Sequence, residues 1–209
     1  MLHPRMSTLS GWRRHHCRPP LAIGTRGAPS NDRNPHVNDI RVRNRETLGR
    51  SRGGLSTKIH LAADQRARPL ARVTSSGQRN DALGFEPVMA RLRIPRRGPG
   101  RPRTRPGRVL ADKAYSSRGI RSHLRRRGVQ AVIPEPSDQS RHRKRRGSAG
   151  GRPVSYDVDA YRLRNTVERA INKLRGYRAV ATRFDKRDYV YRGSVDLASI
   201  GIWLRDPVI

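Results

Sequence analysis

The segment DVDAYRLRNTVERAINKLR, residues 157–175, sets one carboxylate among basic residues at helical spacing. Tyr161, Arg164, Glu168 and Arg175 lie three, four and seven residues apart, so one helix presents all four on about the same side. This face holds Glu168 between cations that can contact phosphate groups. The simpler interpretation is a solvated ion pair between Glu168 and the basic residues around it.

This helix also has start and stop signals in the sequence. Asp157 or Asp159 can cap its N-terminus, and Gly176 follows its last turn. A neighbouring apolar stripe predicts that the helix packs on a sheet. The stripe consists of Leu163, Val167, Ala170, Ile171 and Leu174.

A second carboxylate follows a short apolar run. Residues 109–111, Val-Leu-Ala, predict a buried strand that ends on Asp112. The end of a central strand is where α/β folds place their chemistry. The alternative is that Asp112 only caps a turn or a helix, because residues 115–127 predict a helix directly after it.

The remaining elements predict an α/β fold with a mixed sheet covered by helices. Residues 57–63 alternate polar and apolar, and 69–75 return after a polar turn, so they predict a β-hairpin in which His60 has a structural role. The further expected elements are a helix over 80–92, a strand over 130–133 and a last helix that ends near Trp203.

Composition points to a polyanionic partner. The chain has 209 residues, a formal net charge of +31 and a pI of about 11.9, so nucleic acid is the expected partner and a membrane surface the weaker alternative. No long apolar stretch and no secretory signal occur, which predicts a cytoplasmic location and no membrane partner. The single Cys17 excludes an internal disulfide and a cysteine-based zinc cluster.

Three segments carry little apolar sequence. Residues 1–48 show no period, so they predict a disordered basic extension before a domain at 49–205. The loop at 95–108, rich in Pro, Gly and Arg, is expected either to contact DNA or to be a solvated linker. The basic stretch at 137–153 is expected to order only on a phosphate backbone.

Three motifs, in order, resemble those of the DDE transposases of bacterial insertion sequences, of the type of insertion sequences five and four. The motifs are GGLSTKIHLAAD, LADKAYSS and the spaced set Tyr161, Arg164, Glu168 and Arg175, where the family usually has Lys at the last position. The resemblance covers about residues 48–204 and implies a ribonuclease-H-like fold. It also implies DNA cleavage and strand transfer at insertion-sequence ends, a homo-oligomer on DNA and a place in the bacterial nucleoid.

The resemblance also implies roles for individual residues. Asp112 and Glu168 would be catalytic and would ligate Mg²⁺ or Mn²⁺ in a two-metal site. Lys113, Tyr161, Arg164 and Arg175 would contact DNA. Whether the two carboxylates meet does not follow from their spacing, and only the family fold implies it.

The chain departs from the family at its first catalytic Asp. Asp32 and Asp39 lack strand neighbours and Asp64 falls in a hairpin turn, so none replaces it. We hypothesise an N-terminally truncated or frameshifted member, because in a GC-rich gene CGA followed by C reads as Asp one base later. Sequencing the gene tests this hypothesis. The expected product is an impaired or inactive transposase, and the alternative is a non-catalytic basic nucleic-acid-binding protein.

Overall fold

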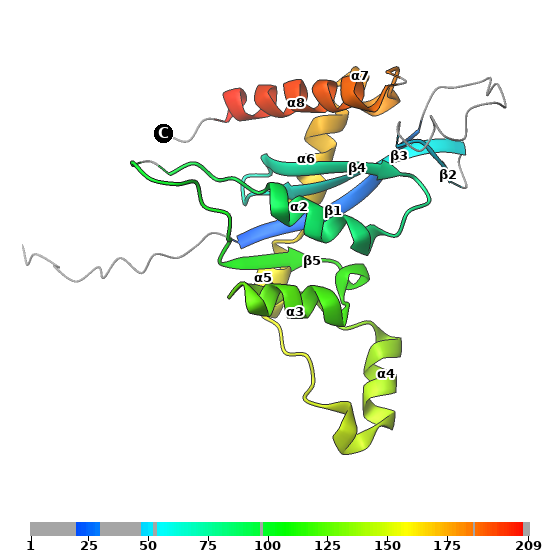
Figure 1. Cartoon of the computed structure of the whole chain (residues 1–209), viewed down its shortest axis with the longest axis vertical. Helices are drawn as coiled ribbons and strands as arrows, with labels where there is room; N and C mark the ends of the chain where they lie inside the picture. The colour runs from blue at the N-terminus through cyan, green and yellow to red at the C-terminus, as the bar shows by residue number, and fades with distance from the viewer. Residues whose placement is uncertain (1–19, 30–46, 52–53, 97, 186, 207–209) are drawn as a thin grey trace, which may run out of the picture.

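The computed structural model describes residues 20–29, 47–51, 54–96, 98–185 and 187–206. A six-stranded mixed sheet runs in the order β2-β3-β1-β5-β6, and β4 also pairs with β3. β3 is antiparallel to β1, β2 and β4, whereas β1, β5 and β6 are parallel (Figure 1). This confirms the predicted α/β class and agrees with a ribonuclease-H-like sheet. The strands are β1 (Pro20–Pro29), β2 (Gly49–Ser51), β3 (Gly54–Ala63), β4 (Pro69–Ser76), β5 (Arg108–Ala111) and β6 (Gln130–Val132).

The central strand β1 comes from a segment that we expected to be irregular. Leu21, Ala22 and Ile23 are buried, because β1 pairs with β3 on one side and with β5 on the other. An apolar run of three residues is too short to show a period, so only the pairing partners reveal the strand. The rest of residues 1–46, including Asp32 and Asp39, lies outside the described residues.

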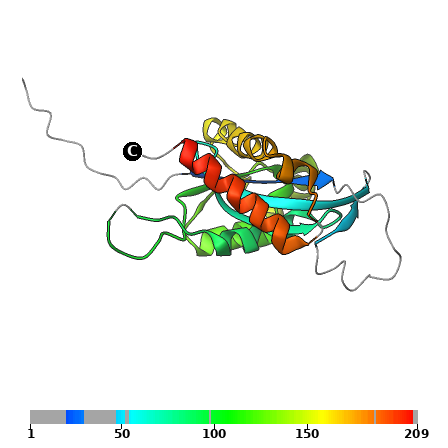
Figure 2. The same ribbon diagram turned by 90° about the horizontal axis from the view of Figure 1, so that it is seen from above.

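Helices cover both faces of the sheet (Figures 1 and 2). On one face, α2 (Phe85–Arg91) and α3 (Arg118–Arg126) bury apolar side chains against β1 and β5. On the other face, α6 (Asn165–Arg175) packs on β1 and β3, and it also contacts α7 (Arg178–Thr182) and α8 (Asp188–Arg205). The sheet is therefore the middle layer of a three-layer domain. Pairing within the sheet fixes the direction of β5, and packing on the sheet fixes the direction of α6.

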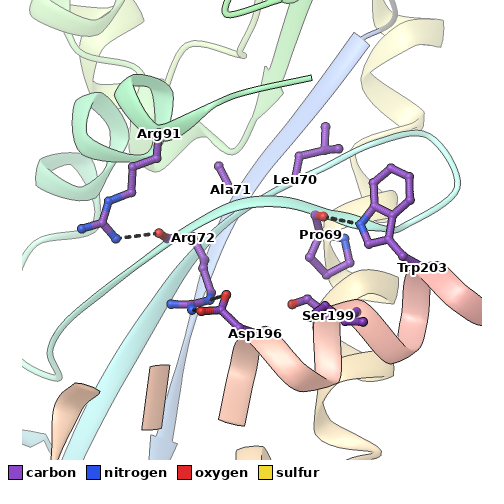
Figure 3. Close-up of a pocket in the computed structure, with 9 residues that line it drawn as sticks. Pro69, Leu70, Ala71, Arg72, Arg91, Asp196, Ser199 and Trp203 are labelled. Carbon is purple, nitrogen blue, oxygen red and sulfur yellow. Dashed lines mark hydrogen bonds and ion pairs between the residues drawn. The ribbon is translucent and has the colours of Figure 1, made fainter. Parts of the chain in front are cut away.

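Helix α8 lies along the β4 side of the sheet and closes part of its edge. The Trp203 indole donates a hydrogen bond to the Pro69 carbonyl oxygen at 2.7 Å, and the Arg91 guanidinium donates to the Arg72 carbonyl oxygen at 3.1 Å (Figure 3). Arg72 also forms an ion pair with Asp196 of α8. These contacts border a groove of about 420 Å³ between β4, α2 and α8.

A buried carboxylate anchors the start of α8. Asp188 accepts hydrogen bonds from the hydroxyls of Thr47 at 2.6 Å and Thr74 at 2.8 Å, and Arg192 lies 3.1 Å away. Buried charges are tolerated only with such partners. The contact therefore joins α8 to β4 and to the residues that precede β2.

His60 has the structural position that its strand pattern predicts. Its ring is buried on β3, and Nε2 lies 2.7 Å from the Ser75 hydroxyl of β4. Gly84 approaches the ring so closely that a Cβ atom there would clash with it. Burial lowers the pKa of His60, because the charged imidazolium would lose its hydration.

Candidate active site

Asp112 directly follows β5, as the sequence predicts. It is the N-cap of the short turn Lys113–Tyr115, and its carboxylate accepts a hydrogen bond from the Lys113 backbone N–H at 2.7 Å. Its side chain is 46% exposed. The capping alternative is therefore realised, and one carboxylate oxygen remains directed to other contacts.

Glu168 lies in the first turn of α6, but the helix that carries it is shorter than predicted. We expected one helix over residues 157–175, whereas the structure has α5 (Val158–Arg162) and α6 (Asn165–Arg175). At the junction, Thr166 and Val167 donate backbone hydrogen bonds to residues three positions back, which tightens the turn. Asp157 caps α5 by accepting from the Ala160 N–H, so the predicted start is confirmed.

Arg164, at this junction, reaches both carboxylates. Its guanidinium lies 3.3 Å from Glu168 and 3.9 Å from Asp112. Tyr161 also lies close enough to Asp112 for the carboxylate to act on its hydroxyl, and its ring centroid is 5.5 Å from the Arg164 guanidinium. Burial raises the pKa of Tyr161, so its hydroxyl keeps its proton at neutral pH. The structure therefore brings four of the candidate residues into one cluster.

Two other candidate residues stand apart from this cluster. Arg175 ends α6, and seven residues of helix separate it from Glu168 by about 10 Å. The Lys113 side chain is exposed, and its backbone N–H is the part that contacts Asp112. Neither side chain has a described partner that fixes it on the carboxylates.

The described carboxylates do not complete a two-metal site. No group of three His, Cys, Asp or Glu side chains in the described part of the chain is placed to hold a metal ion. The last registered pair of β1 and β5 is Ile23 with Ala111, so the next residue, Gly24, lies level with Asp112. A Cβ atom at Gly24 would lie 2.9 Å from a methyl group of Val167. The donor set therefore does not fit the metal pair that the resemblance implies.

Asp64, the remaining acidic residue near β1, does not repair this deficit. It follows β3 in the hairpin turn, and Ala63 pairs with Ala22 towards the start of β1. Its carboxylate is held by Arg68 and by the backbone N–H groups of Arg66 and Arg68. The expectation that Asp64 is no substitute agrees with this geometry.

One element of this region could not be read from the sequence. The stretch expected to order only on DNA instead contains α4 (Ser137–Arg145) and a short turn, Gly147–Gly150. Helix α4 has no buried residue, so no apolar period marks it. The local signals are Asp138 in its first turn and the basic residues in its last turn, which both favour a helix through its dipole.

The fold and the cluster define an α/β domain with two neighbouring carboxylates beside its central strands, and comparison with known proteins identifies the family. A family model described as a transposase DDE domain matches residues 40–192. The chain belongs to this family. The match begins after β1, so the strand that lies beside Asp112 is outside it.

Two similar proteins are both described as transposases of insertion sequence elements. The chain is 30% identical over 131 residues to a protein assigned as the transposase of insertion sequence element IS402 in Burkholderia cepacia, covering 63% of this chain and 54% of that one. It is 28% identical over 151 residues to one assigned to IS6501 in Brucella ovis, covering 72% of this chain and 100% of that one. The chain thus spans about half the length of the first relative.

Within the described residues, no helix has both the length and the apolar character to cross a membrane.

Proposed function

We propose that this chain is an insertion-sequence transposase domain that binds DNA but is impaired in DNA cleavage. Family membership, the net charge of +31 and the names of both relatives support DNA as the partner. We further propose that insertion-sequence ends are the specific DNA and that the chain acts as a homo-oligomer there.

The arrangement of the carboxylates supports the proposal that DNA cleavage is impaired. Asp112 and Glu168 approach one guanidinium, that of Arg164, while the position level with Asp112 on β1 is Gly24. Two-metal phosphodiester cleavage relies on carboxylates that hold ions about 4 Å apart. With two described carboxylates and an internal cation between them, the cluster favours binding a phosphate backbone over activating water.

The test combines DNA binding with plasmid nicking. The chain is expected to retard duplex DNA with a steep salt dependence, because each phosphate contact releases counterions. Supercoiled plasmid with Mg²⁺ or Mn²⁺ is expected to stay as intact as with the Asp112→Asn and Glu168→Gln variants. Metal-dependent nicking that both variants lose would contradict the impairment, and failure to bind DNA would contradict the proposal as a whole.

A further inference from the structure

The segment formed by α4 and the turn after it, Ser137–Gly150, projects from the domain as a separate arm (Figure 1). None of the residues of α4 is buried. The chain folds back on itself at Gly150, where a Cβ atom would clash with the Arg143 carbonyl oxygen. A helix that buries nothing gains little from packing, so its residues are explained better by a partner than by the core.

One side of α4 attaches the arm beside Asp112. Gln139 accepts a hydrogen bond from the Ser116 hydroxyl at 3.2 Å, and one turn later Arg143 lies 3.1 Å from Glu135. Ser116 is buried and closes the turn that Asp112 caps. Arg121 braces this attachment by donating to Ser116 and to the Ile133 carbonyl oxygen, both at 2.8 Å.

The opposite side of α4 carries exposed cations. Arg141 and Arg145 lie one turn apart and about 200° around the helix from Gln139 and Arg143, and Lys144 adjoins them. No described carboxylate lies within ion-pair distance of these three cations. One side of α4 thus fixes the arm to the domain, and the other side offers cations to solvent. A surface that contacts phosphates in a fixed position needs both.

We propose that the α4 arm is a phosphate-contacting surface that extends the path of DNA from Asp112 and Glu168 onto Arg141, Lys144 and Arg145. This inference rests on the proposed DNA binding. Nine helical residues span about 13 Å, and the phosphates of one strand recur about every 3.4 Å along the duplex axis, so an arm lying along that axis covers about four nucleotides. The partner is a nucleic-acid backbone, because α4 offers cations and no apolar side chain to a protein partner.

Acetylation of lysines in the full-length chain, with and without duplex DNA, locates the path. Lys113, the exposed residue that follows Asp112, reports on the surroundings of the carboxylate cluster and Lys144 on the arm. Lys58, paired with Asp81 at 2.7 Å, reports on a distant part of β3. DNA is expected to slow the modification of Lys113 and Lys144 several-fold and to leave Lys58 unchanged. Protection of Lys113 without Lys144, or of Lys144 without Lys113, overturns the inference but leaves DNA binding intact.

Charge removal then tests the energetics. Changing Arg141, Lys144 and Arg145 to Gln is expected to lower the slope of log affinity against log salt by about 2 to 3, since each lost phosphate contact removes about 0.9. The matched control changes Arg79, Arg93 and Arg178 to Gln, which removes the same charge from exposed positions outside both the arm and the loop at 95–108.

The control is expected to change the slope by less than half as much. Equal losses in the two variants would show that only net charge matters and would overturn the inference. Circular dichroism establishes that both variants remain folded. A wild-type chain that binds no DNA would overturn the proposed function itself, so the two failures are distinguishable.

Discussion

The Arg164 guanidinium lies 3.9 Å from the Asp112 carboxylate, although the two residues come from different elements. Arg164 is at the start of α6, and Asp112 directly follows β5. The same guanidinium lies 3.3 Å from Glu168. Two carboxylates that share one cation repel each other less than two that face each other alone. Arg164 therefore stabilises the geometry of the pair in this chain.

Replacing Arg164 by Gln should lower the free energy of unfolding by about 0.5 to 1 kcal/mol, the range of partly exposed ion pairs. The loss should shrink in about 0.5 M salt, because screening weakens the repulsion between Asp112 and Glu168. Urea denaturation at low and high salt measures both effects. Arg162→Gln is the matched control, since its partner Asp159 is 88% exposed and 3.3 Å away. An equal loss in the two variants would argue against a shared role for Arg164.

A carboxylate at Gly24 should create a divalent-ion site. The double variant Gly24→Asp, Val167→Ala adds an acidic group level with Asp112 and removes the methyl groups that a Cβ atom would meet. Thermal unfolding of this variant should shift upwards by several degrees with excess Mn²⁺, since a ligand that binds the folded state stabilises it.

The wild-type chain and Val167→Ala alone are the controls for this experiment. Neither should respond to Mn²⁺ by more than a nonspecific salt effect. The single Gly24→Asp change should be less stable than the double variant, because Val167 crowds the new side chain. A Mn²⁺ shift as large in the wild type as in the double variant would show that the natural donor set already suffices.

His60 should make the fold sensitive to mild acid. Burial holds its pKa in the folded chain below the ordinary 6.5, so below about pH 6.5 the unfolded chain takes up the proton first. Stability should therefore fall as pH drops from about 6.5 towards the folded pKa, and stay level with respect to His60 above pH 6.5. His60→Gln should flatten this fall in urea titrations between about pH 5 and 8. The exposed His142→Gln should leave this fall in stability unchanged. If stability still falls in the same way in His60→Gln, a group other than His60 causes the fall.

Asp188→Ala should be strongly destabilising. The change leaves the hydroxyls of Thr47 and Thr74 without their acceptor and Arg192 without its carboxylate. Unmade buried hydrogen bonds of this kind cost about 1 to 3 kcal/mol each, so a total loss of about 2 to 4 kcal/mol is expected. Asp159→Ala, at an exposed position, should cost under about 0.5 kcal/mol. Chemical denaturation compares the two, and similar losses would contradict the anchoring role of Asp188.

The sequence was sufficient for the elements that have a clear period. The hairpin of β3 and β4, the helices on either side of Asp112, and the mixed sheet are confirmed. Asp112 was placed correctly at a strand end because the run before it is apolar and short. The single helix predicted over 157–175 is divided into α5 and α6 near Arg164. There, backbone hydrogen bonds to residues three positions back interrupt the continuous helix that periodicity predicts.

Three features needed the tertiary structure. β1 is defined by its pairing with β3 and β5, and its three buried apolar residues carry no pattern of their own. Helix α4 buries nothing and so leaves no apolar signal. The contact of Arg164 with both carboxylates joins residues that are distant in sequence, and spacing alone cannot encode it. The catalytic and DNA-contacting roles of the candidate residues stay predictions.

The bonds that Trp203 and Arg91 make to the carbonyl groups of β4 also bear on how this protein behaves at high concentration. In the described part of the chain, β4 pairs with β3 alone, so its other side is an edge onto which a foreign strand can add. The indole and the guanidinium occupy the acceptors at Pro69 and Arg72 that such a strand would use. α2 and α8 thus both protect this edge from edge-to-edge aggregation, and loss of α8 would free the acceptor at Pro69.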